Sequence, residues 1–264
     1  MIQVLEHVAV ACGGRVLALR NAAMETEDKV DQLGQHFSTR ADRESQELGL
    51  SLLAGAWPAE IVIAEEDEHR GDIPPDCTVF DPLDGTTNYF NGLDEFGVTL
   101  CTFRAEAPTY AVAYFPVSGT LVSAVRGSGC FIGTFGEGTR VTRIPWHGVS
   151  DKTQMGTDVG SWTVRHDTFD RVLRPLATRF NIISTMSAIE GGRRVLQGQI
   201  GAYWNLGIAK IWDAAAMALA ITEAGGIACD PAGNSICWNR VDCDWILAGN
   251  QTLADIILEY SRGW

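Results

Sequence analysis

Residues 77–88 read Cys-Thr-Val-Phe-Asp-Pro-Leu-Asp-Gly-Thr-Thr-Asn, an apolar run followed at once by two carboxylates, a proline and a glycine. The β-branched and aromatic side chains at residues 78–80 predict a buried strand. The Asp-Pro and Asp-Gly steps that follow are typical of tight turns. The segment therefore predicts a strand whose end carries two acidic side chains to one place.

The two aspartates admit two interpretations. In the first, the carboxylates of Asp81 and Asp84 and the carbonyl of Leu83 converge on a divalent cation, and such hard oxygen ligands suit Mg²⁺. In the second, the aspartates only shape the turn. Residues 85–88, Gly-Thr-Thr-Asn, favour the first interpretation, because backbone N–H groups at a helix start can face an anion. The same residues could also be ordinary turn and capping residues.

Further acidic residues lie at other predicted element ends. Glu65 and Glu66 directly follow the apolar run 61–63, although the charge run 65–68 could equally be a solvated surface. Asp213 precedes an alanine-rich helix, where an aspartate commonly caps the first turn. A cap and a metal ligand are compatible roles for one carboxylate, so both stay open for Asp213.

Hydrophobic periodicity predicts alternating helical and extended segments along the rest of the chain. The N-terminal helix has one apolar face, and the short strands between residues 96 and 141 are typical of an antiparallel meander. Residues 22–38 are polar and without period, so they predict a mobile loop that could close over a site. The predicted helices cover residues 1–20, 39–55, 166–179, 188–197, 213–224 and 253–260, and the predicted strands cover residues 61–63, 78–80, 98–103, 109–115, 121–125, 181–185, 202–204 and 245–248.

Composition bounds the class of protein. The 264 residues, 46% of them hydrophobic, suffice for one large core of layered α and β elements. A net charge of −13 argues against direct nucleic-acid contact, because binding to a phosphate backbone depends on Lys and Arg. No uninterrupted apolar run reaches the ~20 residues that span a bilayer, so we expect no membrane partner and a cytoplasmic location. The seven cysteines form no CxxC pair and predict reduced, mostly buried thiols.

Three segments together resemble the signature of the inositol monophosphatase family. They are Ala-Glu-Glu at residues 64–66, the motif at residues 81–88, and Trp-Asp-Ala-Ala at residues 212–215 followed by Glu-Ala-Gly-Gly at residues 223–226. The resemblance runs from about residue 5 to the C-terminus. It implies an α+β fold, the layered αβαβα sandwich of the inositol monophosphatase and fructose-1,6-bisphosphatase type, and a homodimer. A single phosphatase domain is expected, with the metal and phosphate motif in residues 1–150 and the substrate pocket in residues 151–264.

The resemblance also implies an activity. A phosphoric monoester hydrolase of this family uses Mg²⁺, is inhibited by Li⁺, and hydrolyses a small phosphate monoester by a metal-activated water. The expected substrate is inositol monophosphate or a related sugar, cyclitol or amino-alcohol phosphate. Histidinol phosphate, a bisphosphorylated nucleotide and fructose bisphosphate are alternatives within the enzymes. From a different class, the chain could be a regulatory protein of the same fold that contacts the transcription machinery.

Family roles carry over to individual residues. The resemblance implies two to three Mg²⁺ ions held by Glu65, Asp81, Asp84, Asp213 and the carbonyl of Leu83. It implies catalytic roles for Thr86, Asp42 and Glu66, with Thr86 and Asp42 helping to activate the attacking water. It implies substrate binding by Gly85, Thr86, Ser187, Ala188, Asn205, Lys210 and Asp213.

Three departures from the family pattern fall in the expected substrate pocket. Asn205 stands where family members commonly have an acid, Met186 stands where they have a glycine, and one additional residue follows Gly207 before the metal-binding aspartate. Lys210 either faces the substrate, where it could pair with a second phosphate or a carboxylate, or is an ordinary solvated lysine. The sequence therefore predicts the reaction class and leaves the alcohol open.

Overall fold

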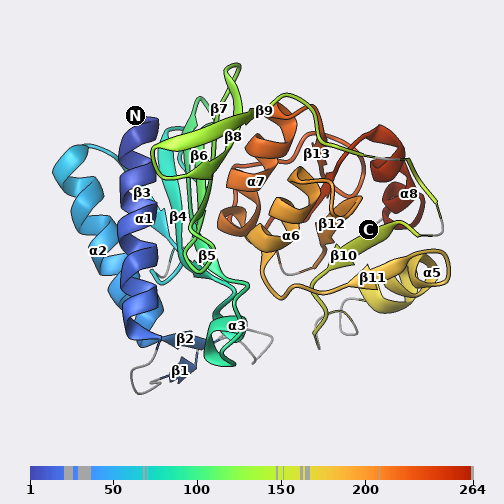
Figure 1. Ribbon diagram of the computed structural model, residues 1–264, viewed down its shortest axis with the longest axis horizontal. Coiled ribbons are helices and arrows are strands. Elements are labelled where there is room, and N and C mark those ends of the chain that lie inside the picture. Colours follow the sequence, from blue (N-terminus) through green and yellow to red (C-terminus); the bar gives the residue numbers. More distant parts are fainter. Residues whose placement is uncertain are drawn as a thin grey trace.

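The computed structural model describes residues 1–20, 26–28, 37–67, 69, 71–146, 148–150, 152–160, 163, 167–207 and 209–262. Five layers follow one another across the molecule (Figure 1). A helix pair covers a seven-stranded sheet, a second helix pair separates this sheet from a five-stranded sheet, and further helices cover the far side. The expected α+β fold, an αβαβα sandwich, is confirmed.

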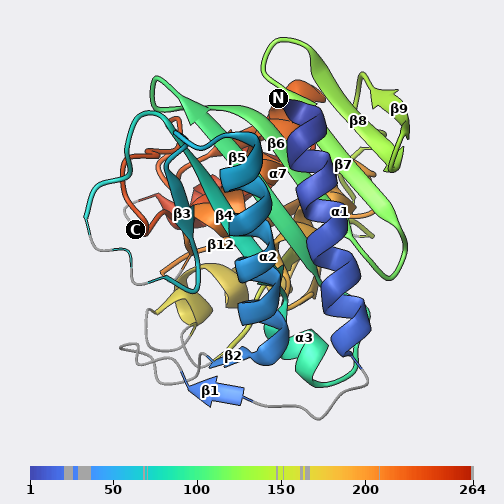
Figure 2. The ribbon, with the colours of Figure 1, turned by 90° about the vertical axis from the view of Figure 1, so that its left-hand side faces the viewer.

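The first layer consists of α1 (Ile2–Leu19) and α2 (Arg40–Ala56), which lie side by side across one face of the large sheet (Figure 2). The apolar face of α1 packs Leu5, Val8 and Cys12 into this interface, as its periodicity predicted. Within the described part of the chain, α1 is the single helix long and apolar enough to cross a membrane.

The seven-stranded sheet has the order β3-β4-β5-β6-β7-β8-β9. β3 pairs with β4 in parallel and every later pair is antiparallel, so the predicted meander is confirmed. All eight residues of β4 are buried because helices cover both faces, with Val79 on one side and Phe80 on the other. The strands are β3 (Val62–Ala64), β4 (Cys77–Asp84), β5 (Gly97–Arg104), β6 (Ala107–Phe115), β7 (Thr120–Val125), β8 (Gly129–Thr134) and β9 (Glu137–Val141).

The middle layer consists of α6 (Ala188–Leu196) and α7 (Ile211–Glu223), between the two sheets. Nearly all residues of α7 are buried, because the helix contacts both sheets and packs against α6. It ends at Glu223, two residues before Gly225, whose φ of 80° fits the predicted glycine stop.

The five-stranded sheet has the order β11-β10-β12-β14-β13. A π-helical turn, η1 (Phe169–Leu173), runs directly into α5 (Arg174–Ala177), and with α8 (Gln251–Ser261) these helices cover its outer face. The helix expected over residues 166–179 thus appears in two parts, and residue 166 lies outside the described residues. The strands are β10 (Gln154–Thr157), β11 (Asn181–Ile183), β12 (Ala202–Asn205), β13 (Ile227–Cys229) and β14 (Trp245–Ala248).

The polar stretch before α2 differs from its prediction. β1 (Thr26–Asp28) pairs antiparallel with β2 (Phe37–Thr39), so a loop was the wrong prediction for these residues. The ring of Phe37 packs edge-on against that of Phe90 at 5.3 Å, which gives β2 an apolar anchor despite its polar neighbours. Residues 21–25 and 29–36, the remainder of the stretch predicted to close over the site, lie outside the described residues.

The cysteines agree with the expectation of reduced thiols. All seven are free, and six of them are buried. Cys237 is the exposed one.

Candidate metal and active site

A β-bulge at the end of β4 brings its two aspartates to one side. Asp81 pairs with Thr99 and Asp84 with Gly97, so three steps along β4 oppose two along β5. In a regular strand, side chains three residues apart point to opposite faces, and one additional residue cancels this alternation. Pro82 lacks an N–H group and is tolerated at such a bulge. The aspartates converge as predicted, but through a bulge within the strand and not through a tight turn after it.

Asp213 from α7 completes a carboxylate cluster with Asp81 and Asp84. One carboxylate oxygen from each of the three lies within 4.8 Å of the others. Oδ2 of Asp213 also accepts a hydrogen bond from the backbone N–H of Lys210 at 3.0 Å, so Asp213 both caps its helix and joins the cluster. Three carboxylates at this spacing fit the oxygen donor set of Mg²⁺.

Glu65 extends the cluster from the neighbouring strand. Its backbone N–H donates to the carbonyl of Phe80 at 3.0 Å and so continues the parallel pairing of β3 with β4. This places Glu65 alongside Asp81, and the two side chains share a hydrogen bond. Two strand ends therefore deliver acids to one edge of the sheet, as the sequence predicted.

Burial and mutual repulsion raise the pKa values of these groups. For Asp81, burial is the largest cause, followed by the charges of Glu65, Asp84 and Asp213. For Asp213, burial is again first, and Lys210 partly opposes the rise. Burial raises the pKa of Asp84 to about 7. Since like charges repel in a poorly solvated site, a bound cation would offset the cost of ionising them.

Thr86 and Asp42 meet beside the cluster. The hydroxyl of Thr86 lies 2.9 Å from Oδ1 of Asp42 and 3.0 Å from the carbonyl oxygen of Leu83. Asp42 is fixed by the capping box of α2, since its Oδ2 accepts from the backbone N–H of Thr39 at 2.7 Å and from the Thr39 hydroxyl at 2.5 Å. One oxygen of Asp42 is thus held by its own helix, and the other is directed at Thr86.

Gly85 joins β4 to the short helix α3 (Thr86–Phe90). Its φ is 84°, and a Cβ atom there would lie 2.8 Å from the carbonyl oxygen of Glu95 and 3.1 Å from Cβ of Ser187. The position therefore requires glycine both for its backbone angle and for the close approach of α6.

The start of α6 contacts Asp84 directly. The hydroxyl of Ser187 donates to Oδ2 of Asp84 in a short hydrogen bond, and the N–H of Ala188 donates to Oδ1 at 3.1 Å. The predicted substrate-binding residues Ser187 and Ala188 are thus at the cluster, where their polar groups orient an aspartate.

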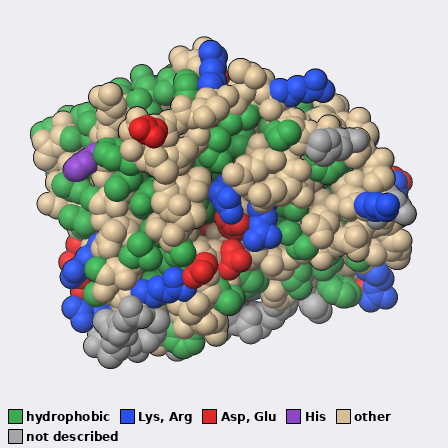
Figure 3. All heavy atoms as spheres, viewed as in Figure 1, with side chains coloured by type: hydrophobic (Ala, Val, Ile, Leu, Met, Phe, Trp, Pro, Cys, Tyr) green, Lys and Arg blue, Asp and Glu red, His purple; other side chains and the backbone are tan. Residues whose placement is uncertain are grey.

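Charged side chains gather near the middle of the face seen in Figure 3. Among the ion pairs of α6, Glu190 contacts Arg193 at 2.7 Å and Arg194 at 2.8 Å. Arg194 also lies 3.6 Å from Glu95, so these charges tie α6 to the segment beside Gly85.

Three residues predicted to bind substrate or to act in catalysis, Asn205, Lys210 and Glu66, contact other groups of this chain. The amide of Asn205 donates to Oδ2 of Asp158 at 2.9 Å, and its Oδ1 accepts from the backbone N–H of Asp158 at 3.3 Å. Lys210 forms an ion pair with Asp242. The backbone N–H of Glu66 donates to the side chain of Gln46 in α2 at 2.9 Å.

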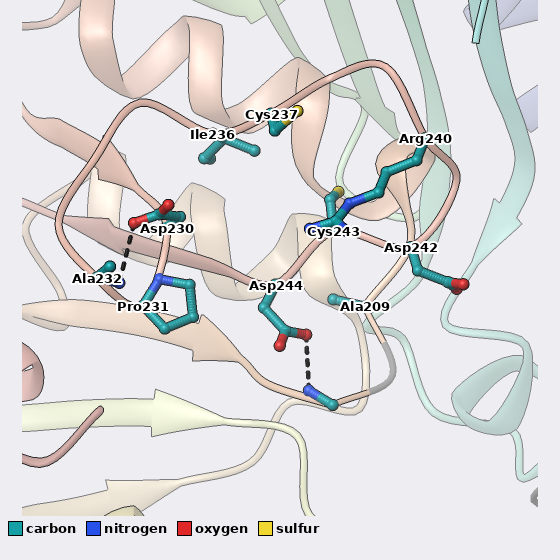
Figure 4. Close-up of a pocket in the computed structure, with 11 residues that line it drawn as sticks. Ala209, Asp230, Pro231, Ala232, Ile236, Cys237, Arg240, Asp242, Cys243 and Asp244 are labelled. Carbon is teal, nitrogen blue, oxygen red and sulfur yellow. Dashed lines mark hydrogen bonds between the residues drawn. The ribbon is translucent and has the colours of Figure 1, made fainter. Parts of the chain in front are cut away.

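A loop formed by residues 230–244 supports the segment that leads into Asp213. It surrounds a hollow of about 440 Å³, at whose base the carboxylate of Asp244 accepts from the N–H of Gly207 at 2.6 Å (Figure 4). Nearby, the N–H of Cys243 donates to the carbonyl of Ala209 at 3.0 Å. These contacts hold the chain just before α7 and therefore help to fix Asp213.

Sequence reasoning missed the residue Asp158 and the long-range contacts of Asn88. Asp158 follows β10 with no motif around it, and only its proximity in space to Asn205 reveals it. Asn88 stands inside the quoted motif, yet its amide donates to the carbonyls of Glu95 at 2.6 Å and Thr185 at 2.7 Å. It joins α3 to the chain before α6.

The five-layer αβαβα sandwich brings Asp81 and Asp84 of one sheet together with Asp213 of α7, beside Glu65, in a group of carboxylates that could hold a divalent cation. The sequence model of the inositol monophosphatase family matches residues 1–262. The chain belongs to the inositol monophosphatase family.

Relatives carry two different names. The chain is 29% identical over 244 residues to Nus factor SuhB of Salmonella typhimurium. The alignment covers 90% of this chain and 88% of the relative. The chain is 25% identical over 238 residues to inositol-1-monophosphatase of Synechocystis sp.. This alignment covers 86% of this chain and 77% of the relative. The relatives therefore divide between an enzyme name and a factor name.

Solved structures share the fold. The SuhB protein of Bartonella henselae superimposes with a TM-score of 0.84 at 23% identity, over 99% of this chain and 98% of that chain. A structure described as an IMPase/NADP phosphatase with Mg²⁺ and phosphate gives a TM-score of 0.75 at 22% identity, over 93% and 88% of the two chains. At these identities the likeness concerns the fold alone.

Proposed function

We propose that this protein is a Mg²⁺-dependent phosphatase of small phosphate monoesters. The observation that carries the proposal is the cluster of Asp81, Asp84 and Asp213, whose carboxylate oxygens lie within 4.8 Å of one another beside Glu65. Buried carboxylates this close together repel one another when ionised, so a bound cation would stabilise their charged forms. Family membership agrees with the proposal.

Two to three Mg²⁺ ions would be held by Glu65, Asp81, Asp84, Asp213 and the carbonyl of Leu83. When bound, they would supply positive charge to the phosphate oxygens and lower the pKa of a water molecule.

Thr86 and Asp42 would orient the attacking water. Both protein partners of the Thr86 hydroxyl, Oδ1 of Asp42 and the carbonyl of Leu83, are acceptors. The hydroxyl proton is therefore directed at one of these groups, and the oxygen lone pairs of Thr86 can accept a hydrogen bond from water. Glu66, directly after the proposed ligand Glu65, is proposed as a further catalytic carboxylate.

The substrate would lie between α3 and the start of α6. Gly85 and Thr86 would approach the phosphate, and Ser187, Ala188 and the segment from Asn205 to Lys210 would surround the alcohol. Inositol monophosphate or a related sugar, cyclitol or amino-alcohol phosphate is the proposed class, and the name of the Synechocystis relative agrees with it. Position 205 carries an amide in place of the acid that is common in the family, and this amide donates a hydrogen bond to Asp158.

Phosphate release tests the proposal. We expect Mg²⁺-dependent turnover on at least one ester in a panel of inositol monophosphates, histidinol phosphate, a bisphosphorylated nucleotide and fructose bisphosphate. Turnover should vanish with EDTA and return with added Mg²⁺. Hydrolysis that is unaffected by removing divalent cations would refute the metal mechanism.

A regulatory role is the second candidate, and the name Nus factor SuhB among the relatives favours it. Under this alternative the protein would act by contacting the transcription machinery. Stable capture of a transcription protein by the purified chain, together with no hydrolysis across the panel, would establish it over the phosphatase.

We propose the remaining family properties in the same way. The protein would be a cytoplasmic homodimer, inhibited by Li⁺, with no direct contact to nucleic acid or membrane. Light scattering would test the dimer, and a Li⁺ titration of phosphate release would test the inhibition.

A further inference from the structure

A buried carboxylate outside the cluster, Asp158, lies directly after β10. Only 8% of it is exposed. The hydroxyl of Tyr203 donates to its Oδ1 in a short hydrogen bond, and the amide of Asn205 donates to its Oδ2 at 2.9 Å. Burial raises the pKa of Asp158, and backbone hydrogen bonds from Met186 and Ser187 join those from Tyr203 and Asn205 in partly opposing this rise. Donors thus surround this carboxylate, which is the condition for keeping a charge buried.

The two backbone donors, Met186 and Ser187, belong to the turn that precedes α6. Met186 in this turn has a φ of 50°, a conformation that persists in a residue other than glycine only when its surroundings hold it. The hydroxyl of Thr185 contacts that of Tyr203 at 2.6 Å, and the carbonyl of Thr185 accepts from Asn88 at 2.7 Å. Asp158 and Asn88 therefore hold the turn from two sides.

The ring of Tyr203 packs directly against the backbone of two glycines, which leave room for it. Cβ atoms added at Gly156 of β10 and Gly191 of α6 would lie 2.5 Å and 2.4 Å from its ring. The ring fills the space between this strand and this helix, so its hydroxyl has little freedom to leave Asp158.

The turn leads directly to a cluster carboxylate. Ser187 donates to Oδ2 of Asp84, and the N–H groups of Ala188 and Ile189 lie 3.1 Å and 3.4 Å from its two oxygens. Any shift of the turn would therefore change how Asp84 faces Asp81 and Asp213.

We propose that Asp158 is a positioning residue of the metal site, which fixes the turn at residues 185–187 and through Ser187 holds Asp84 in its ligand orientation. Asn205 then serves as the partner of Asp158. The inference rests on the proposed metal site and goes beyond it, because it assigns a role to a residue outside the cluster.

Metal affinity measured without substrate tests this inference. Titration calorimetry with Mn²⁺ should show about a tenfold loss of affinity for Asp158→Ala and a smaller loss for Asp158→Asn, since partners behind metal ligands typically contribute ~10–100-fold. The matched control is Thr102→Val, which removes a buried hydroxyl pair with Thr78 at 2.8 Å in the other sheet. It should bind Mn²⁺ like the wild type.

A double exchange, Asp158→Asn with Asn205→Asp, separates positioning from general destabilisation. It keeps one acid and one amide in the pair and should restore affinity to within about threefold of the wild type, a difference under ~1 kcal/mol. Unchanged affinity in Asp158→Ala would overturn the inference, and so would an equal loss in Thr102→Val or a failure of the double exchange to restore binding.

The same measurements distinguish a failure of the positioning role from a failure of the proposed phosphatase function. If Mn²⁺ binds and responds to Asp158 as expected while no ester in the panel is hydrolysed, the positioning role stands and the phosphatase proposal fails. If the wild type binds no Mn²⁺, both are overturned.

Discussion

The hydroxyl oxygen of Thr86 lies 2.9 Å from Oδ1 of Asp42, although the two residues are 44 positions apart in the sequence. Each stands at the start of a helix, Thr86 in α3 and Asp42 in α2. Two helix starts and a strand end therefore meet at one point, and only the folded sheet brings them together.

Thr86→Val should abolish most turnover while keeping the metal cluster. The substitution keeps the shape of the side chain but removes the group that would orient water, so kcat should fall by about 10²–10⁴. The control is Thr87→Val at the exposed next position, which should keep kcat within about threefold of the wild type. Stopped assays of phosphate release at saturating Mg²⁺ measure both. Equal loss in the two variants would contradict the role of Thr86.

Asp81→Asn should remove the response to Mg²⁺. Asp81 lies at the centre of the cluster, and the neutral amide of the asparagine that replaces it would be a poor metal ligand. We therefore expect kcat to fall by at least ~10²-fold even at saturating Mg²⁺. In a thermal melt, the wild type should gain about 3 kcal/mol of stability at Mg²⁺ a hundredfold above its Kd, and the variant should gain almost none. Asp76→Asn, at the exposed opposite end of β4, is the matched control. Near wild-type turnover by Asp81→Asn would show that the metal assignment is wrong.

The pH dependence of stability follows from the raised pKa of Asp84. Burial raises this pKa to about 7, against about 4 for an unfolded aspartate, so the folded state binds the proton more tightly. The contribution to stability is therefore complete below about pH 4 and is lost as the pH rises through about 7. For the metal-free protein, the melting temperature should fall between about pH 5 and pH 8, and Mg²⁺ should restore it at the higher pH. Asp84→Asn should reduce this slope, to which the raised pKa values of Asp81 and Asp213 also contribute, and an equal slope in the variant would exclude Asp84 as one of its sources.

Local sequence predicted the elements that local patterns specify. The meander strands β5 to β7 were predictable because alternation and glycine-rich turns lie within each hairpin, whereas for β8 and β9 the sequence predicted only the range of the meander. β10 was missed because Met155 is its only strongly apolar residue, and β13 was missed because its three residues show no alternation of apolar and polar side chains. β2 was missed because its anchor, the contact of Phe37 with Phe90, spans two separate segments.

The candidate site also has a part that local sequence predicted and a part that it did not. The convergence of Asp81 and Asp84 was predictable because they are close in sequence, but the bulge was not, because it depends on the register with Thr99 and Gly97 of another strand. The contact of Ser187 with Asp84 spans 103 positions, and only the family resemblance suggested that α6 approaches the motif. Long-range hydrogen bonds therefore carry the part of the site that the sequence alone does not specify.

Gly85→Ala should damage both stability and activity, and Gly92→Ala separates the two causes. Both glycines have positive φ, 84° and 75°, so an alanine at either costs about 1–2 kcal/mol through its backbone angle. At Gly92 no heavy atom lies within 4 Å of the added Cβ, whereas at Gly85 it would meet the Glu95 carbonyl at 2.8 Å and Ser187 at 3.1 Å. Relief of that contact requires α3 and α6 to separate, which adds about 1–3 kcal/mol and shifts Ser187 away from Asp84. Chemical denaturation and phosphate release should therefore show Gly92→Ala destabilised but active, and Gly85→Ala more destabilised and nearly inactive. Full activity in Gly85→Ala would mean that the approach of α6 to this glycine does not matter for the site.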